Sequence, residues 1–214
     1  MAMSITAFPP SIQQIASIAF PTRLGQFRMI GFERELPGPA GPRRETALAL
    51  IMGDLKSSPP LLRIHSQCLT GDALGSLRCD CGEQLQLALS MIAGEGRGIL
   101  IYEEKEGRGI GLVAKLRVYE LQDLGLDTVE ANERFGLKND YRDYSLPAGI
   151  LRQLGVSKVR IITNNPDKVK AMRNAGIEVV ERVPCEAAPN PYAAAYLETK
   201  KRKLGHLLAG CHQS

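Results

Sequence analysis

Three of the five cysteines in this chain lie within fourteen residues, at Cys68, Cys79 and Cys81. Cys68 follows a predicted strand. The other two stand just before a predicted helix, where the positive end of the helix dipole favours thiolate. Three thiolates can bind one zinc ion and leave its fourth tetrahedral position to water, as catalytic zinc sites do. We therefore favour a catalytic zinc site.

Two alternatives to catalytic zinc stay open at this point. His65, three residues before Cys68, could complete a closed structural site of four protein ligands. The cysteines could also be ordinary buried residues, although Cys-x-Cys at a helix start is a poor choice for packing alone. Five cysteines without a recognisable secretory signal indicate a reducing compartment, so we expect a cytoplasmic protein.

A glycine-rich segment, residues 104–111 (EKEGRGIG), lies between a predicted strand and a predicted helix. Its glycines would let the backbone approach a ligand closely, and the amides of a helix N-terminus suit phosphate. The signal is weak, because the spacing is neither Walker A nor GxGxxG. Arg108 can therefore be read as a phosphate partner or as an exposed loop residue.

Two further segments carry candidate polar groups. Residues 140–143 (DYRD) form a charged stretch whose residue types alone indicate a solvated loop. Thr163 and Lys168 flank Asn164-Asn165-Pro166, which predicts a helix start with an N-cap followed by proline. They offer a second anion contact or, more simply, a helix cap and a surface lysine.

The hydrophobic patterning predicts a mixed α/β fold, β-rich in its first half and built of βα units in its second. Strands are expected within residues 16–33, 45–53, 61–65, 97–102, 158–163 and 177–182. Helices are expected through 85–92, 112–125, 166–176 and 192–208, with Asp80 and Glu83 at the spacing of a cap for the first of them. We expect one domain over 16–208, a flexible extension at 1–15 and a tail at 209–214.

The composition excludes several classes of protein. Apolar residues make up 44% and charged residues 23% of the chain, as in globular proteins, and no apolar run is long enough to span a membrane. The net charge of +4 fits an anionic ligand as well as nucleic acid. A zinc-stabilised nucleic-acid-binding module would need interleaved aromatic residues, and there are only 5% aromatics and no Trp. We expect neither a membrane nor a nucleic-acid partner.

Seven sequence blocks together resemble one enzyme family, GTP cyclohydrolase II of riboflavin biosynthesis. They are HSQCLTGDALGSLRCDCG, EGRGIGL, LQDLGLDTVEAN, DYRDY, ITNNPDKV, ERVP and TKKRKLGHLL, in family order between about residues 17 and 208. The resemblance implies zinc-dependent hydrolysis of GTP that opens the imidazole ring and releases formate and pyrophosphate. The remaining product is 2,5-diamino-6-(5-phosphoribosylamino)pyrimidin-4-one. It also implies Mg²⁺ on the triphosphate and a homodimer.

The same resemblance assigns roles to individual residues. The matches to the zinc ligands are Cys68, Cys79 and Cys81. The matches to catalytic residues are Asp140 as proton acceptor, Arg142 as the residue assigned as nucleophile at the α-phosphate, and Tyr119. The matches to nucleotide contacts are Arg63, Ile64, His65, Ser66, Gln67, Gln84, Glu106, Gly107, Arg108, Thr128, Thr163 and Lys168. A guanidinium stays protonated in proteins and suits phosphate charge better than nucleophilic attack, so the role of Arg142 stays open.

The chain departs from the family pattern at two places. Gln67 stands where the family usually has Glu, and Glu104-Lys105 stands where it usually has Arg-Gln. The first change removes a charged hydrogen-bond acceptor that could serve the guanine edge or the residues around the zinc ion. The second replaces the positive charge of Arg with the negative charge of Glu near the triphosphate. The alternative function is therefore a diverged paralogue that stops at a formamide product or acts in another purine-derived pathway.

Overall fold

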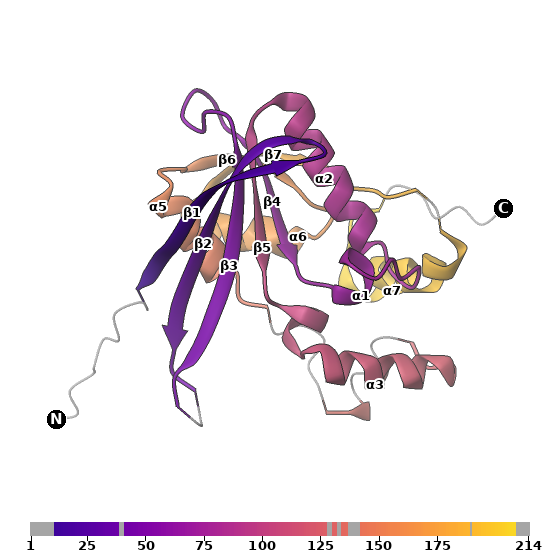
Figure 1. The fold of residues 1–214 in the computed structure, drawn as a ribbon. Coiled ribbons are helices and arrows are strands. Elements are labelled where there is room, and N and C mark those ends of the chain that lie inside the picture. Colours follow the sequence, from indigo (N-terminus) through magenta and orange to yellow (C-terminus); the bar gives the residue numbers. More distant parts are fainter. Residues whose placement is uncertain are drawn as a thin grey trace.

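A single seven-stranded sheet organises the chain in the computed structural model, which describes residues 11–38, 41–127, 130–131, 134–136, 142–188 and 190–208 (Figure 1). The strand order is β1-β2-β3-β5-β4-β6-β7. Pairs from β1 to β5 are antiparallel, and pairs from β5 through β4 and β6 to β7 are parallel. The strands are β1 (Ile12–Thr22), β2 (Gly25–Leu36), β3 (Arg43–Met52), β4 (Leu61–Ser66), β5 (Gly98–Glu103), β6 (Lys158–Ile162) and β7 (Glu178–Val183).

The parallel half is built from two crossover units, β4–α2–β5 and β6–α6–β7, which confirms the predicted α/β fold with a β-rich first half. Helix α6 begins as expected, since the Asn165 side chain accepts a hydrogen bond from the Asp167 amide and proline follows it. The helices are α1 (Leu69–Asp72), α2 (Cys81–Glu95), η1 (Glu106–Gly109), α3 (Leu112–Asp123), α5 (Ser145–Gln153), α6 (Pro166–Asn174), η2 (Pro191–Ala193) and α7 (Ala194–Leu204).

Hydrophobic cores cover both faces of the sheet. Ile99 and Ile101 of β5 join the cluster that includes Ile150 of α5, while Leu100 faces the cluster that includes Ile92 of α2. Strands buried on both faces read as continuous apolar runs, which is why residues 97–102 could be predicted as a buried strand. None of the described helices has the length and apolar composition needed to cross a membrane.

Several elements differ from those that the sequence predicts. The segment 16–33 holds parts of two strands joined at a tight turn, and β1 starts at Ile12, so the extension predicted at 1–15 is wrong for residues 12–15. The first residues of β1 escaped prediction because most side chains of this strand are exposed at the sheet edge. Helix α5 was not predicted, since its Pro147 and Gly149 resemble loop residues, yet its leucines and isoleucine are buried. The predicted terminal helix is shorter, with η2 and α7 covering 191–204.

Helix α2 begins without the cap that the sequence predicts. Asp80 occupies the N-cap position but makes no capping hydrogen bond. Its carboxylate accepts hydrogen bonds from Gln84 Nε2 and from Lys200 Nζ on the distant helix α7. A buried cation competes successfully for this carboxylate, because a charge-assisted bond is stronger than a bond to a backbone amide.

The parallel strands determine where a site can form. Strands β4, β5 and β6 run in the same direction and end at Ser66, Glu103 and Ile162, so the segments that follow them meet at one edge of the sheet. In open α/β sheets, ligands bind outside the carboxyl ends of the strands. The cysteine segment, the glycine-rich segment and Thr163 all start at this edge.

Candidate active site

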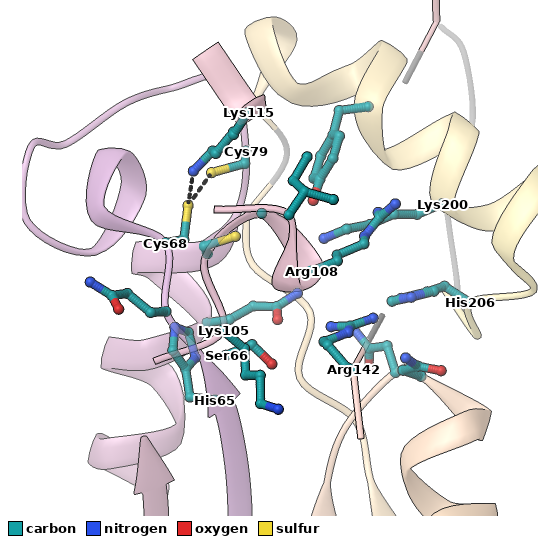
Figure 2. A pocket seen from close by; sticks show the side chains of 18 of the residues that line it. His65, Ser66, Cys68, Cys79, Lys105, Arg108, Lys115, Arg142, Lys200 and His206 are labelled. Atoms are coloured by element: carbon teal, nitrogen blue, oxygen red, sulfur yellow. Dashed lines mark hydrogen bonds between the residues drawn. The ribbon is translucent and has the colours of Figure 1, made fainter. Parts of the chain in front are cut away.

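One cavity lies at this edge, and the segments that follow the parallel strands line it (Figure 2). Its walls come from the ends of β4 and β6, from η1, α3 and α6, and from the C-terminal segment that includes α7. The cysteines lie on one side, and Arg142, Lys200 and His206 lie on the other (Figure 2). The lining residues used below are Arg63, His65, Ser66, Gln67, Cys68, Cys79, Cys81, Gln84, Lys105, Gly107, Arg108, Lys115, Tyr119, Arg142, Thr163, Asn164, Lys168, Tyr196, Lys200 and His206.

The three thiols gather where two helices begin. Cys68 directly precedes α1, Cys81 is the first residue of α2, and Cys79 lies two residues before it. Their Sγ atoms lie within 4.8 Å of one another, and those of Cys68 and Cys79 are 3.6 Å apart. Sulfurs bound to one tetrahedral zinc at about 2.3 Å would be about 3.8 Å apart. This set of three soft donors therefore fits zinc and provides one ligand fewer than a closed structural site.

Gly71 makes room for this cluster. A Cβ atom at that position would lie 2.9 Å from Cys79 Sγ and 3.3 Å from Cys68 Sγ. The thiols therefore approach the backbone of α1 in a space that any side chain would fill. The glycine of the LTGD block is explained by this close approach.

Charge around the thiols favours ionisation of Cys68. Hydrogen bonds from Cys79 and Cys81, together with the Lys115 ammonium 3.1 Å away, lower the pKa of Cys68 far below its usual value. The bond to Cys68 and burial raise the pKa of Cys79 to about 11. Burial alone would lower the pKa of Lys115, but its bonds to Glu106 and Cys68 raise it. Lys115 is thus a permanent cation beside the first thiolate.

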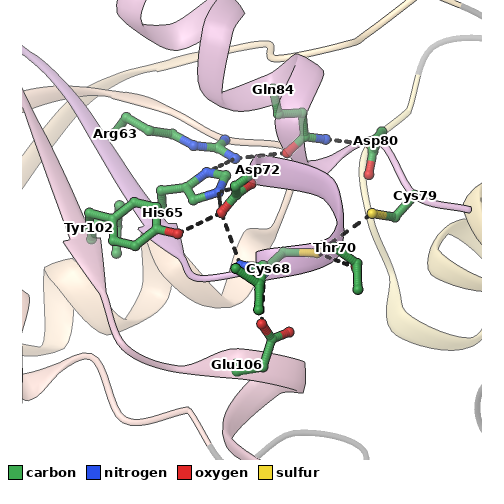
Figure 3. Close-up of polar contacts among 12 residues, drawn as sticks. Arg63, His65, Cys68, Thr70, Asp72, Cys79, Asp80, Gln84, Tyr102 and Glu106 are labelled. Atoms are coloured by element: carbon green, nitrogen blue, oxygen red, sulfur yellow. Dashed lines mark hydrogen bonds and ion pairs between the residues drawn. The ribbon is translucent and has the colours of Figure 1, made fainter. Parts of the chain in front are cut away.

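His65 is committed to a different network, which argues against a closed site with His65 as fourth ligand (Figure 3). Its Nε2 donates to Asp72 at 3.0 Å, and its Nδ1 lies 3.4 Å from Arg63 Nη2. Asp72 also accepts from the Cys68 amide and the Tyr102 hydroxyl. Burial lowers the pKa of His65, which fits a neutral ring with one donating and one accepting nitrogen. His65 therefore orients the loop that carries Cys68.

Glu106 joins the glycine-rich segment to the cysteine segment. Its carboxylate accepts from the Leu69 amide at 2.7 Å and from Lys115 Nζ at 2.7 Å. The next two residues, Gly107 and Arg108, both have left-handed backbone angles, with φ of 58° and 61°. This conformation costs about 1–2 kcal/mol for a residue other than glycine. The strain is localised at Arg108, whose side chain lines the cavity.

The remainder of the cavity is cationic. No Asp or Glu occurs among its described lining residues, whereas seven cationic side chains do: Arg63, Lys105, Arg108, Lys115, Arg142, Lys168 and Lys200. Buried side-chain atoms without a hydrogen-bond partner among the described residues include Arg63 Nε, Ser66 Oγ and Arg108 Nη1. Buried donors normally have partners, so these atoms indicate a polar, anionic ligand.

The departure at Glu104-Lys105 has a structural counterpart. Glu104 is exposed, while Lys105 lines the cavity and donates to Glu45 Oε1 at 2.8 Å. Arg34 binds the other oxygen of Glu45 at 2.7 Å. Burial opposes ionisation of Glu45, but the bonds from Lys105 and Arg34 hold its pKa below the usual value. The lysine therefore attaches the cavity wall to strands β2 and β3.

Glu103 lies beneath the cationic wall in an unusual state. It is fully buried, and neither carboxylate oxygen has a hydrogen-bond partner among the described residues. Burial raises its pKa to about 7, although Lys168, Lys105 and Arg142 favour the ionised form. Burial also lowers the pKa of Lys168, whose Nζ donates to the Ile64 carbonyl at 2.7 Å.

Glu103→Gln is expected to stabilise the protein at pH 8 and to leave its stability at pH 5 nearly unchanged. A carboxyl group whose pKa rises on folding destabilises the fold as pH rises through the interval between the unfolded value, 4.5, and the folded value, about 7. Glutamine resembles the protonated acid and does not ionise. Thermal unfolding at both pH values tests this, with the exposed Glu104→Gln as the matched control. An equal change in Tm at the two pH values would contradict it.

Most residues that the family resemblance selects meet at the cavity. Two lie behind it: Ile64, whose side chain is buried in the core, and Glu106, whose carboxylate is bonded as described above. Thr128 and Asp140 lie outside the described residues. All other selected positions line the cavity.

Several lining residues escaped the reasoning from residue types. Lys115 is buried on α3 beside Val118 and Tyr119, at helical spacings of three and four that could have indicated its inward orientation. Lys200 follows Tyr196 by four residues, a helical spacing that could likewise have indicated an inward orientation. Its ammonium lies 4.4 Å from the centroid of the Tyr196 ring. His206 follows the helix, and no periodicity could have selected it.

Comparison with known proteins agrees with this geometry. The family model described as GTP cyclohydrolase II matches residues 13–184. GTP cyclohydrolase-2 of Proteus mirabilis is 52% identical over 92% of this chain and 96% of its own length. That of Azotobacter vinelandii is 52% identical over 95% of both chains, and that of Shewanella frigidimarina is 51% identical over 94% of this chain and 98% of its own. The chain therefore belongs to the GTP cyclohydrolase II family and is a hydrolase of that family.

Proposed function

We propose that this protein hydrolyses GTP, opening the imidazole ring with release of formate and pyrophosphate, as the first step of riboflavin biosynthesis. The observation that carries the proposal is the division of one cavity into two ends. A cluster of three thiols lies at one end, and cations without a counter-carboxylate among the described residues line the rest. A purine nucleoside triphosphate has the matching polarity, with an electrophilic ring carbon at one end and up to four negative charges at the other.

Zinc is the proposed cofactor, held by Cys68, Cys79 and Cys81. When bound there with an open position, it lowers the pKa of a coordinated water and so supplies a nucleophile at neutral pH. Lys115 and the two helix N-termini offset the negative charge of the three thiolates. Mg²⁺ is proposed to arrive with the triphosphate as part of the substrate.

Proton transfer at the ring is assigned to Asp140, the family's proton acceptor. Tyr119 lies on the thiol side of the cavity, with Arg78 4.8 Å and Lys115 5.6 Å from its ring centroid. Burial raises the pKa of Tyr119 to about 12, so its hydroxyl stays protonated and can donate a hydrogen bond to the guanine ring.

Phosphate binding is assigned to the cationic end. Arg63 and Arg108 each have a buried nitrogen without a partner among the described residues, and Lys168 lines the same cavity. Arg142 lines the same wall, and we propose that it stabilises charge at the α-phosphate as pyrophosphate leaves. A guanidinium suits that work because it is planar, always charged and able to bind two oxygens at once.

A homodimer and a cytoplasmic location complete the proposal. Val113 and Leu116 of α3 are 67% and 49% exposed, and such apolar side chains are ones that a partner subunit would cover. The competing candidate is a paralogue with a formamide product, and it rests on Gln67, which lines the cavity beside Cys68.

One assay tests the proposal. The protein is incubated with GTP, Zn²⁺ and Mg²⁺, and formate and pyrophosphate are measured in parallel. Equal amounts of both support the proposed function. Pyrophosphate without formate would instead favour the paralogue, and the absence of both would refute the proposal.

Gln67→Glu is expected to lower KM for GTP about fivefold. A carboxylate can accept from both guanine N1–H and the 2-amino group with charge assistance, which is worth about 1 kcal/mol more than a neutral acceptor. Inosine triphosphate lacks the 2-amino group and should respond less. Measuring kcat/KM for both nucleotides with both proteins checks this. A changed kcat with an unmoved GTP/ITP ratio would place Gln67 near the metal rather than the base.

A further inference from the structure

The segment after α7 turns back into the cavity. Gly205 has φ of 64°, and both it and His206 donate backbone hydrogen bonds to the Lys200 carbonyl, a left-handed helix end that suits glycine. The next amide, that of Leu207, donates to the Asn164 carbonyl at the start of α6 at 2.8 Å. The fold therefore fixes the backbone on both sides of His206.

His206 points into the cationic wall (Figure 2). Three cations from separate segments lie around it in Figure 2, namely Lys200 of α7, Arg108 of η1 and Arg142 before α5. A fourth, Lys168 of α6, also lies close enough to lower the pKa of His206. Two buried carboxyl groups accompany these cations. Asp80 binds Lys200 at 2.6 Å, and Glu103 faces Lys168 and Arg142 from below the wall. Neither carboxylate stands among the described lining residues.

We propose that His206 is a phosphate-contacting residue of this site, an imidazole that binds a proton as the polyanionic end of the substrate enters and then donates a hydrogen bond to a phosphate oxygen. The proposal rests on the proposed function only in taking a nucleoside triphosphate as the ligand. It also assigns a ligand contact to the C-terminal segment. The functions of the thiols and of the glycine-rich segment do not require this contact.

The charge balance supports this coupling. In the free protein, burial and then the cations Lys200, Arg108, Arg142 and Lys168 lower the pKa of His206 to about 3, so the ring is neutral at physiological pH. A negative charge close to a buried imidazole favours the protonated ring, because the attraction between them is weakly screened there. The charges of the phosphate chain therefore raise the pKa of His206 back toward the ordinary range of histidine, and the substrate itself supplies them.

Protonation of His206 on binding makes the affinity for the phosphate chain depend on pH. A group that gains a proton on binding contributes affinity below its bound-state pKa and loses that contribution as pH rises through it. Binding of the phosphate chain should therefore include His206-dependent proton uptake near pH 6, and much less near pH 8.

Calorimetric titration with inorganic tripolyphosphate tests the proposal without any turnover. Protein of measured zinc content is titrated at pH 6 and pH 8 in buffers of different ionisation enthalpy, which gives the protons taken up per ligand. At pH 6, the wild type should take up as much as one proton more per bound ligand than His206→Gln does. At pH 8, this difference should be smaller. Protonation of tripolyphosphate itself cancels in this difference.

Leu207→Gln is the matched control, because it places the same side chain on the exposed neighbouring position and should leave proton uptake at the wild-type value. Equal uptake by wild type and His206→Gln would overturn the proposal. His206→Ala serves as a second variant, and both must keep the wild-type Tm for the comparison. If the protein releases neither formate nor pyrophosphate from GTP but still shows His206-dependent proton uptake, the proposed function is refuted and the role of His206 in phosphate binding is retained.

Discussion

Cys79→Ser is expected to remove zinc from the protein and to abolish formate release. Cys79 Sγ lies 3.6 Å from Cys68 Sγ and within 4.8 Å of the third thiol, so one missing sulfur leaves only two soft ligands. Loss of residues that merely support a ligand costs about 10–100-fold in metal affinity, and loss of a ligand should cost more. Metal analysis of protein purified without chelator should fall from about one zinc ion per chain to a small fraction.

Cys185→Ser is the control for this prediction. Cys185 is also fully buried, and its thiol donates to the Gln84 carbonyl at 3.6 Å, but it is not a member of the three-cysteine cluster. It should keep zinc and activity. Zinc content that survives Cys79→Ser and Cys81→Ser would refute the proposed cofactor, and absence of zinc from the wild type would refute it directly.

The sequence predicted those features that short-range chemistry determines. Cys-x-Cys before a helix, the Asn-Pro helix start and the apolar runs of β4 to β6 each follow from local rules, and the structure agrees with them. Helix α5 did not follow from local rules, because its Pro147 and Gly149 disfavour a helix locally and its stability comes from burial of residues such as Ile150.

Contacts between distant segments could not be predicted from residue types. Lys200 binds Asp80 across 120 positions, and Lys168 binds the Ile64 carbonyl across 104. No periodicity encodes such pairs, since they arise only when the parallel strands bring their carboxyl ends together. His65 shows the same limitation, because its nearness to Cys68 in sequence suggested a ligand while the fold gives its ring to Asp72.

Arg142→Ala is expected to reduce pyrophosphate release by about 10²–10³-fold while changing KM for GTP much less, because a preorganised donor aimed at developing charge acts mainly in the transition state. Arg142 lines the cavity, and its guanidinium lies 5.8 Å from the Tyr144 ring centroid. Six other cations line the same cavity and hold the ground-state charge without it.

Two variants sharpen the measurement of Arg142. Arg142→Lys keeps the charge but loses the two-pronged geometry, and it should recover part of the rate. Arg152→Ala removes an exposed arginine of α5 whose guanidinium binds the Ala175 carbonyl, and it should leave both products unchanged. Formate and pyrophosphate are followed separately, since a loss confined to pyrophosphate assigns Arg142 to the phosphate reaction. If Arg142→Ala releases pyrophosphate at the wild-type rate, Arg142 is excluded from catalysis. The wall of the cavity that carries it would then serve only to bind the substrate.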